Sequence, residues 1–589
     1  MFNTDFPVLS ALIFFPLIAA VVLFLIRGEK TIRVFTLVVG LIECALLLPL
    51  LGFDLSTAEF QFVEKHVWIA VWNINYHLGI DGISILMILL TVLLLPLCVL
   101  CSWSYIGNRV KEFHFCLLLM TAACVGIFSS LDFVLFYIFW EAMLVPMYLL
   151  IAVWGGPNKR YASLKFFIYT LAGSTLFLAA IVAFFIQTGT FSIPELMQHE
   201  YSFRFQVWAF LAMALAFAIK VPLFPFHTWL PAAHVEAPTA GSVLLASILL
   251  KMGTYGFLRF CMPMTPSASD FFAPLMIVLA IISIIYGSLV AIGQQDMKKL
   301  IAYSSVAHMG FVTLGIFVFA FRGIEGAIMH MVNHGIITGA MFMLVGLIYE
   351  RSHSREIADN MGLSRHLPVY TGFLLLFSLA AFGFPGTNGF LSKLLILIGV
   401  FEASYLMGVI FIVGLLLGLA YLMRLLLAVG WGSPSHAESW KDVNIREWIY
   451  LIPLLLLVFY LGLAPGRALN IMGPSIENLL DRFEHERHMT EYSGMSWDVM
   501  RFDCQNPFLQ SQESGDRGQE SVKTKIYEDT FCRVASFPDF LQGNLMIFRS
   551  ENVNSDAQII VSLDENQTGL SVRHSAPLLD HVTSGVDNQ

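Results

Sequence analysis

Long apolar stretches separated by short polar segments make up residues 1–478 of the chain. Most stretches are roughly 20 residues long, which is the length that a helix needs to cross the hydrocarbon core of a bilayer. The pattern predicts an all-α polytopic membrane protein with about fourteen transmembrane helices. We expect the spans near residues 8–26, 32–52, 80–102, 114–131, 133–154, 163–186, 207–222, 240–260, 272–293, 300–320, 327–349, 369–399, 404–430 and 447–466.

The composition agrees with this pattern. Of the 589 residues, 57% are hydrophobic and 13% are charged, whereas a soluble domain carries about 25% charged residues. The sequence has no basic patch, so we expect the lipid bilayer and no nucleic acid as a partner.

Basic residues concentrate in alternate loops. Loops that follow odd-numbered spans hold most of the Lys and Arg, whereas loops after even-numbered spans hold Lys65, Arg204 and Arg322. The positive-inside rule then places the odd loops in the cytoplasm, or in a mitochondrial matrix. Both termini are expected on the opposite, non-cytoplasmic side.

The spans suggest a division of the chain into five parts. Residues 1–112 hold the first three helices, 113–261 and 262–431 hold five helices each, and 432–478 hold the last helix. Residues 479–589 form a polar, acidic tail, which we expect to be partly disordered on the non-cytoplasmic side. The alternative is a small exported domain, since strand-like patches occur at Asn544–Phe548 and Ala557–Leu563.

Several ionisable residues lie deep within apolar spans. Glu141 stands in FYIFWEAMLVPMYLL, Lys220 in LAMALAFAIKVPLF and Lys251 in SVLLASILLKMGTYGF. A charged group at the centre of a span costs about 2.5–3.5 kcal/mol even on lenient scales, so such residues usually serve a function. We predict that these three carry protons; a helix-packing ion pair is the structural alternative.

Two of the lysines lie beside helix-breaking residues. Pro222 and Pro225 follow Lys220. Pro385 and Gly386 precede Lys393 in FGFPGTNGFLSKLLILIG, where Lys393 is predicted to be another proton carrier. A break within a membrane is tolerated only where it is buried in protein or lines water. Paired broken helices in corresponding halves are typical of an inverted-repeat transporter, here spans 4–8 against spans 9–13.

Histidines add candidate proton relays, because a neutral imidazole titrates near physiological pH. A buried histidine that is merely hydrogen-bonded is the structural alternative. His330 and His334 lie four residues apart on one helical face, but no acidic ligand is near in sequence, so we expect no metal site. The candidate relay residues are His308, His330, His334 and Lys165, with His227 and His234 in supporting positions.

Motifs for redox cofactors are missing from the sequence. It has no glycine-rich phosphate loop, no dinucleotide-binding fingerprint after a strand and no cysteine cluster for iron–sulfur. We therefore expect a chain that moves ions and binds no cofactor itself.

The chain resembles the antiporter-like membrane subunits of respiratory complex I, most closely those of the M or subunit-4 type. The resemblance covers about residues 5–480 and is carried by FWEAMLVPMYLLIAVWGG, AIKVPLFPFHTWLPAAHVEAPTAGSVLLASILLKMGTYGFLRF, KKLIAYSSVAHMGFV and MVNHGIITGAMFMLVG. It implies fourteen helices, two inverted five-helix repeats and broken helices 7 and 12. It also implies a non-redox subunit of a proton-translocating NADH:quinone oxidoreductase, with NADH, FMN, iron–sulfur clusters and quinone on other subunits.

The resemblance also implies individual roles. Glu141 is similar to the glutamate of helix 5, Lys220 to its lysine partner in helix 7, and Lys251 to the connecting lysine of helix 8. His308 and His334 then correspond to histidines of the central axis. Lys393 departs from the family, because M-type subunits usually carry a glutamate at this position of helix 12.

Three alternatives remain at this point. Lys393 in F-L-S-K slightly favours an Mrp-type cation/proton antiporter. A membrane subunit of a related hydrogenase or formate-oxidising complex is the second, and a purely structural membrane scaffold is the third. The expected location is a bacterial plasma membrane, with a mitochondrial inner membrane as the alternative.

Overall fold

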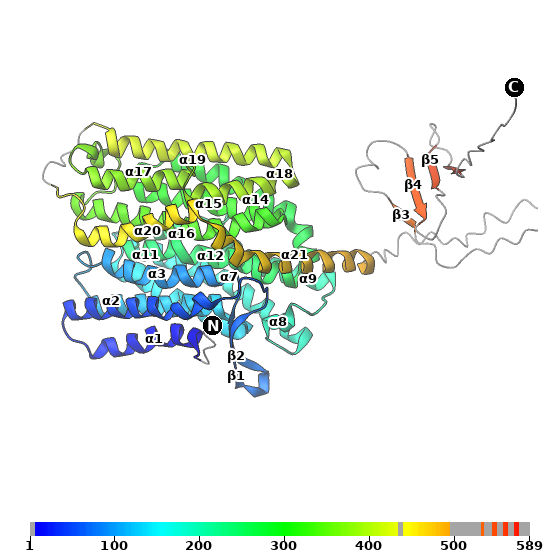
Figure 1. The fold of residues 1–589 in the computed structure, drawn as a ribbon, viewed down its shortest axis with the longest axis horizontal. Coiled ribbons are helices and arrows are strands. Elements are labelled where there is room, and N and C mark those ends of the chain that lie inside the picture. Colours follow the sequence, from blue (N-terminus) through cyan, green and yellow to red (C-terminus); the bar gives the residue numbers. More distant parts are fainter. Residues whose placement is uncertain are drawn as a thin grey trace, which may run out of the picture. The chain divides into compact units, whose positions relative to one another are not determined.

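The computed structural model describes residues 6–433 and 440–494, together with four strands in the C-terminal part of the chain. The chain divides into two compact units, Met1–Asp498 and Val499–Gln589, which are described separately. In unit 1 the long helices lie roughly side by side (Figure 1).

Helices form nearly all the secondary structure of unit 1, as the apolar pattern predicts. Its first part contains α1 (Val8–Val22), α2 (Glu29–Leu46), α3 (Ile85–Cys101), α4 (Val110–Ser129), α5 (Phe133–Ala142), α6 (Leu144–Trp154), α7 (Lys159–Thr188), α8 (Ile193–Leu196), α9 (Phe203–Lys220) and α10 (Trp229–Glu236). Its second part contains α11 (Thr239–Leu244), α12 (Leu250–Gly256), α13 (Met262–Met264), α14 (Pro266–Gly293), α15 (Met297–Phe317), α16 (Phe321–Ser352), α17 (Pro368–Phe382), α18 (Asn388–Ala403), α19 (Tyr405–Trp431), α20 (Ile445–Leu463) and α21 (Gly466–Gly494).

Twelve helices among the described residues are long and apolar enough to cross a membrane, or up to thirteen if one bent pair is counted as a span. The shorter apolar helix Ile85–Cys101 is not included in that number. A mostly helical fold with many candidate membrane spans is therefore confirmed, while the count of about fourteen spans stays a prediction.

The long helix α16 forms the centre of unit 1, since its most apolar window is completely buried. It packs against α11, α15, α17, α18 and α20. Two asparagines join it to α18: Asn333 donates to the Asn388 carbonyl at 2.7 Å, and Asn388 donates to the Asn333 side chain at 3.0 Å. Residues that are distant in sequence therefore meet along α16.

A β-hairpin that the sequence analysis did not predict follows α2. Strands β1 (Gln61–Ile69) and β2 (Ile74–Ile80) pair antiparallel. Asp132 attaches the hairpin to the helices, because one of its carboxylate oxygens accepts a hydrogen bond from the backbone amide of Asn75 at 3.0 Å. The other oxygen accepts from the Val134 and Leu135 amides at the start of α5. One buried carboxylate thus caps a helix and holds a strand.

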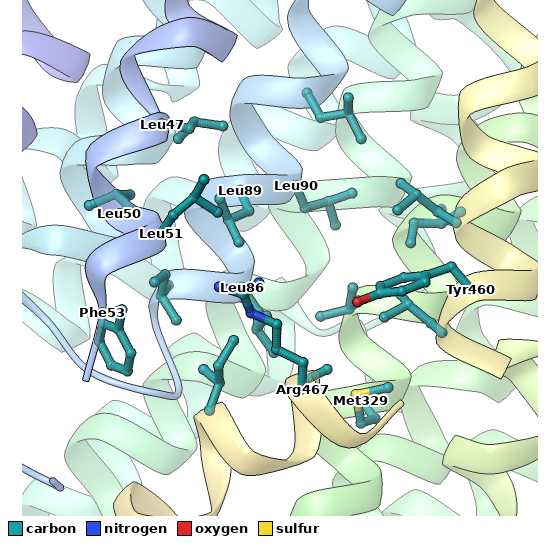
Figure 2. Close-up of a pocket in the computed structure, with 18 of the residues that line it drawn as sticks. Leu47, Leu50, Leu51, Phe53, Leu86, Leu89, Leu90, Met329, Tyr460 and Arg467 are labelled. Atoms are coloured by element: carbon teal, nitrogen blue, oxygen red, sulfur yellow. The ribbon is translucent and has the colours of Figure 1, made fainter. Parts of the chain in front are cut away.

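An apolar cavity opens between the helical turn after α2 (Leu48–Gly52), α3, α16, α20 and the start of α21 (Figure 2). Helix α21 itself was not predicted, and it crosses the boundary that we expected at residue 479. We predicted spans from long apolar runs in the sequence. Helix α21 is hydrophilic and contains no such run, which explains why it was not predicted.

Unit 2 contains a four-stranded antiparallel sheet in the order β3 (Cys532–Val534), β4 (Leu545–Ser550), β5 (Gln558–Leu563) and β6 (Leu570–Ser575). Strands β4 and β5 lie where the sequence has its strand-like patches. Most of the remaining expected tail lies outside the described residues.

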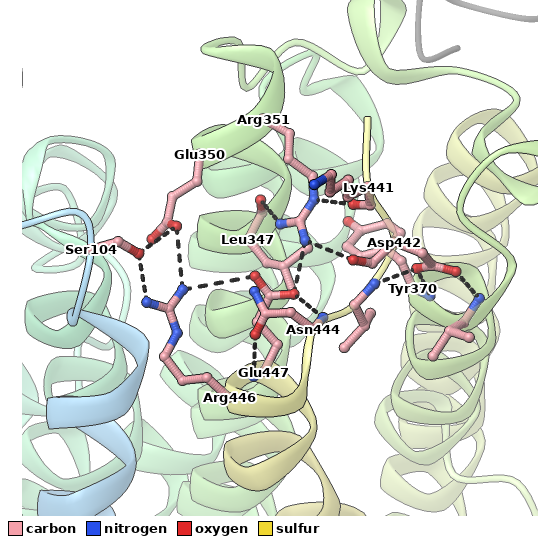
Figure 3. A network of polar contacts seen from close by, with 12 residues as sticks. Ser104, Leu347, Glu350, Arg351, Tyr370, Lys441, Asp442, Asn444, Arg446 and Glu447 are labelled. Carbon is pink, nitrogen blue, oxygen red and sulfur yellow. Dashed lines mark hydrogen bonds and ion pairs between the residues drawn. The ribbon is translucent and has the colours of Figure 1, made fainter. Parts of the chain in front are cut away.

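A network of charged groups joins α16 to α20 at the ends that the positive-inside rule assigns to the cytoplasm (Figure 3). Arg351 donates to Glu447 at 2.8 Å, and both side chains are largely buried. Glu447 also accepts from the Asn444 amide, which completes a capping box at the start of α20. Asp442 accepts from the Val369 amide at the start of α17. The network therefore fixes three helix ends together.

We expect the substitution Glu447→Gln to lower the stability of the protein by roughly 3 kcal/mol, because it leaves the buried Arg351 guanidinium without its counter-charge. Thermal denaturation of the detergent-solubilised protein, followed by size-exclusion fluorescence, measures this effect. Glu402→Gln is the matched control, since Glu402 is exposed on α18 and forms no ion pair within residues 6–433 and 440–494. Equal melting of the two variants would contradict the assigned role of Glu447.

Candidate functional site

Glu141 lies at an interruption between α5 and α6. Helix α5 ends at Ala142 and α6 begins at Leu144. Pro146 explains this end, because a proline has no amide to donate and its ring clashes with the carbonyl four residues earlier, here that of Ala142. Glu141 is partly buried, and its Oε1 atom is enclosed without a hydrogen-bond partner. The sequence analysis missed this break, although Pro146 was a visible signal.

Lys220 is the last residue of α9, and its amine reaches the end of α5. Its side chain is buried at 2% exposure. The Nζ atom lies 3.9 Å from the Met143 sulfur and 4.8 Å from the centre of the Trp140 ring. These two residues flank Glu141, so Lys220 and Glu141 lie at one site, although they form no ion pair within 4.0 Å. A cation over an aromatic face is stabilised by the ring quadrupole.

Side chains satisfy the backbone groups that the break after Lys220 releases. Pro222 and Pro225 have no amide hydrogen to donate, so the backbone hydrogen bonds of α9 end at Lys220. Helix α10 begins only at Trp229. The Trp229 indole donates to the Ile219 carbonyl at 2.8 Å. The Phe224 amide donates to the Ser283 hydroxyl at 2.9 Å. The break is therefore held in place by α10 and α14.

His227 and His234 lie on either side of the start of α10. Both side chains are buried, and no ring nitrogen of either has a hydrogen-bond partner in the described structure. The His234 ring stacks on Phe342 of α16, with ring centres 4.5 Å apart and an interplanar angle of 12°. Aromatic packing alone leaves their polar atoms unsatisfied, which is costly in an apolar interior.

Lys251 occupies an irregular helix. Helix α12 is flanked by two π-helical turns, Leu245–Leu249 and Phe257–Cys261. The Lys251 side chain is fully buried, and its Nζ atom donates to the Ala246 carbonyl. The same Nζ atom lies 2.7 Å from Nδ1 of His334 on α16. Single π-turns are frequent at functional sites, and here one supplies an acceptor for the buried amine.

A chain of polar atoms continues from α16 toward the second break. His308 of α15 and His330 of α16 share a hydrogen bond of 3.3 Å, and His330 and Ser392 of α18 share one of 2.9 Å. The rings of His308 and His334 have centres 5.2 Å apart. The Tyr421 hydroxyl of α19 lies 3.5 Å from the other nitrogen of His308. Groups from α12, α15, α16, α18 and α19 thus converge.

Lys393 caps the broken helix in the second half of the chain. Helix α17 ends at Phe382, before Gly383 with a φ of +99°, and α18 begins at Asn388. The Lys393 amine donates to the Ala381 and Phe382 carbonyls at 2.7 and 2.8 Å. A cation at a helix C-terminus is favoured by the helix dipole and satisfies orphan carbonyls. A Cβ atom at Gly389 would lie 1.9 Å from the Ala380 carbonyl, so this approach requires glycine.

Most of the predicted residues fall into two groups. Lys251, His334, His308, His330 and Lys393 lie along one buried path, and Glu141 with Lys220 forms a second site. Lys165 is not in either group. It is partly exposed on α7, and its amine lies 3.2 Å from the Tyr161 hydroxyl.

Sequence reasoning missed Ser392 and Tyr421, which extend the chain of histidines. Ser392 directly precedes Lys393 in the broken segment, and Tyr421 is a polar group within an apolar span. Both were visible as sequence signals, but only the packing of α18 and α19 against α15 and α16 gives them partners. Within the described residues, no group of three or more His, Cys, Asp or Glu side chains has metal-binding geometry.

Sequence comparisons relate most of this chain to known proteins. Residues 130–418 match the family model described as NADH:quinone oxidoreductase/Mrp antiporter, TM, and residues 10–126 match NADH-ubiquinone oxidoreductase chain 4, amino terminus. NADH-quinone oxidoreductase subunit M of Rickettsia conorii is 42% identical over 491 residues, covering 81% of this chain and 100% of that protein.

Solved structures agree with the sequence comparisons. A chain of respiratory complex I from Thermus thermophilus with bound NADH is similar with a TM-score of 0.74 and 29% identity, covering 80% of this chain and 99% of that chain. A chain of the Mrp complex from Dietzia sp. has a TM-score of 0.70 at 20% identity, covering 83% of this chain and 56% of its own, and this likeness concerns the fold alone.

We expect Trp229→Phe to destabilise the first break by about 1–3 kcal/mol, because it leaves the Ile219 carbonyl buried without a donor. The thermal midpoint of the solubilised protein measures this loss. Trp208→Phe is the matched control, since Trp208 is 67% exposed on α9, and surface substitutions usually stay within about 0.5 kcal/mol. A wild-type midpoint for the Trp229 variant would show that the indole does not hold the break.

Proposed function

This chain belongs to the family of NADH-quinone oxidoreductase subunit M proteins, and on this premise we propose that it translocates protons in the membrane arm of such a complex. Quinone reduction elsewhere in the complex drives the movement. One observation carries the proposal: the buried Lys251 amine hydrogen-bonds His334, which begins the histidine chain toward Lys393.

We propose fourteen spans, with two inverted repeats in spans 4–8 and 9–13. Two elements support this arrangement. The α9–α10 pair is interrupted after Lys220 and the α17–α18 pair before Lys393, so each proposed repeat holds one broken helix with a buried lysine. By the same reasoning these pairs are broken helices 7 and 12, and both termini lie on the non-cytoplasmic side.

The first step takes place at Glu141 and Lys220. A carboxylate that moves to about 4 Å from an ammonium stabilises it by about 4 kcal/mol at an effective dielectric constant near 20. Lys220 therefore holds its proton while Glu141 is close, and passes it toward Lys251 when the pair separates. Because the helix is interrupted at Met143, Glu141 lies at the end of the short helix α5. The glutamate can therefore move with this helix end, without movement of a longer continuous helix.

The second step moves the proton from Lys251 to His334. Protonated Lys251 donates to the lone pair on Nδ1 of His334, so that His334 carries its own proton on Nε2. Transfer to Nδ1 allows Nε2 to release a proton on the other side of the ring. Nε2 of His334 is buried without a hydrogen-bond partner, and the centres of the His334 and His308 rings are 5.2 Å apart. We propose that a water molecule joins the two rings.

The last step runs through His308, His330 and Ser392. Each imidazole accepts a proton on one nitrogen and gives one up on the other, so the charge moves without movement of the helices. Ser392 directly precedes Lys393, whose amine is held by the end of α17. Loss of the proton from Lys393 weakens this cap, which couples protonation to the conformation of the break.

We further propose that this chain binds no cofactor and acts as a non-redox subunit. NADH, FMN, iron–sulfur clusters and quinone then belong to other subunits, and the neighbouring membrane subunits are its direct partners. The proposed location is a bacterial plasma membrane.

We expect Lys251→Ala to reduce NADH-driven proton uptake by inverted membrane vesicles at least about tenfold. The variant lacks the amine that donates a proton to His334 in the proposed path. A pH-sensitive dye records acidification, and NADH:quinone turnover is measured in parallel. Lys30→Ala is the matched control, because Lys30 is exposed at the start of α2. Normal acidification by an assembled Lys251 variant would refute the proposed path.

We expect Lys393→Glu to destabilise the second break by roughly 3 kcal/mol, because a carboxylate cannot donate to the Ala381 and Phe382 carbonyls and faces a negative helix end. Lys393→Arg keeps the charge and the donors and is expected to lose less. Thermal midpoints, with hydrogen exchange at the end of α17, distinguish the two variants. Equal protection in both would remove the capping role from Lys393.

A further inference from the structure

Glu43 is a buried carboxyl group that has no place in the proposed proton path. It lies on α2, in the inner part of the candidate span Glu29–Gly52 and about 21 Å along the helix from Glu29. Its side chain is 0% exposed, and both carboxyl oxygens are enclosed without a hydrogen-bond partner. Among residues 6–433 and 440–494 it forms no ion pair. An ionisable group at this depth is costly, so its protonation state needs a physical explanation.

The helices that pack against α2 offer no cation at the depth of Glu43. These helices are α1, α3 and α4, and neither α1 nor α3 contains a charged residue. The other charged and imidazole side chains of α2 and α4 all lie in the first two turns of their helices: Glu29, Lys30, Arg33, Lys111, Glu112 and His114. Lys111 marks this end, because its amine donates to the Phe24 carbonyl, which precedes α2, at 3.0 Å. An ionised Glu43 would therefore lack a counter-charge.

The surroundings of Glu43 suit a neutral acid, which has an O–H group to donate and no charge to bury. Helices α2 and α3 approach closely here, since a Cβ atom at Gly40 would lie 3.1 Å from the Pro96 ring. Pro96 has no amide hydrogen, so the Val92 carbonyl lacks its usual intrahelical donor. The thiol of Cys44, the next residue after Glu43, lies 3.9 Å from this carbonyl. An acceptor for a proton donor is therefore present at this level of α3.

Glu43 also lies close to the apolar outer face of α2. The two preceding residues are exposed, Leu41 to 55% and Ile42 to 42%. A small lipophilic reagent that is dissolved in the bilayer can reach the carboxyl by displacing these flexible side chains. The same apolar neighbours exclude a charged, water-soluble reagent, because entry would remove its charge from water.

We propose that Glu43 holds a proton as a neutral carboxylic acid within the membrane, and that it is the residue of this chain that lipophilic carbodiimides modify. In this reaction the acid proton moves to one nitrogen of the carbodiimide, and the carboxyl oxygen bonds to its central carbon. The acyl carbon–oxygen bond then breaks as the acyl group bonds to the other nitrogen. The product is a stable N-acylurea, formed without loss of an atom and without oxidation or reduction. A carboxylate lacks the proton that the first addition needs, so exposed glutamates react slowly.

The first test treats the intact purified complex in phospholipid vesicles with dicyclohexylcarbodiimide and locates the N-acylurea by peptide mass spectrometry. We expect several-fold more modification at Glu43 than at Glu402, which is exposed on α18. A charged, water-soluble carbodiimide should reverse this order. The variant Glu43→Gln should lose the modification. An unmodified Glu43 in the wild-type complex would overturn the proposal.

Infrared spectroscopy measures the protonation state independently. The difference spectrum between the wild type and Glu43→Gln should contain the carbonyl stretch of a protonated carboxyl, unchanged from about pH 6 to pH 8, a range in which an exposed glutamate is ionised. The control Glu402→Gln should instead show the loss of carboxylate bands. Carboxylate bands from Glu43 would also overturn the proposal. Proton pumping enters neither readout, so the outcome is separate from the proposed function.

Discussion

Every polar backbone group inside a membrane must find a partner within the protein, and this constraint organises the centre of the molecule. Each irregular helix releases carbonyls, and a side chain satisfies them nearby. Lys393 donates to the end of α17, Lys251 donates to a carbonyl of the π-helical turn, and the Trp229 indole donates to the end of α9. The breaks and the buried amines therefore stabilise one another, because each would be expensive alone.

In the proposed proton path, this reciprocity would give the lysines a second role. An ammonium that caps a helix end holds that end more strongly than a neutral amine, so the proton that it carries also affects local conformation. The same groups lie at the start and end of the histidine chain. Movement of a proton along the chain would thus alter the two places where the helices are already interrupted, which is a direct way to connect protonation with rearrangement.

Lys393 shows how a departure from a family pattern fits its surroundings. The family resemblance implies a glutamate at this position, but the lysine here faces two carbonyls, which need donors. Gly389 lets α18 approach the Ala380 carbonyl closely, and the asparagine pair of α16 and α18 fixes the register. The second break is thus built around a donor in this chain.

The sequence by itself determined the membrane fold, the buried charges and the breaks at Pro222 and Pro385. These properties depend on run length, on the cost of a charge in an apolar run and on the missing amide of proline, all of which are local. The tertiary structure alone decided which groups meet. Lys251 and His334 are 83 residues apart, and their contact depends on how α12 and α16 are rotated and packed. Likewise, packing made Lys393 a helix cap and left Lys165 at the surface. It also brought Ser392 and Tyr421 to the chain of histidines. The partners of a side chain on another helix depend on packing geometry, which no single segment encodes.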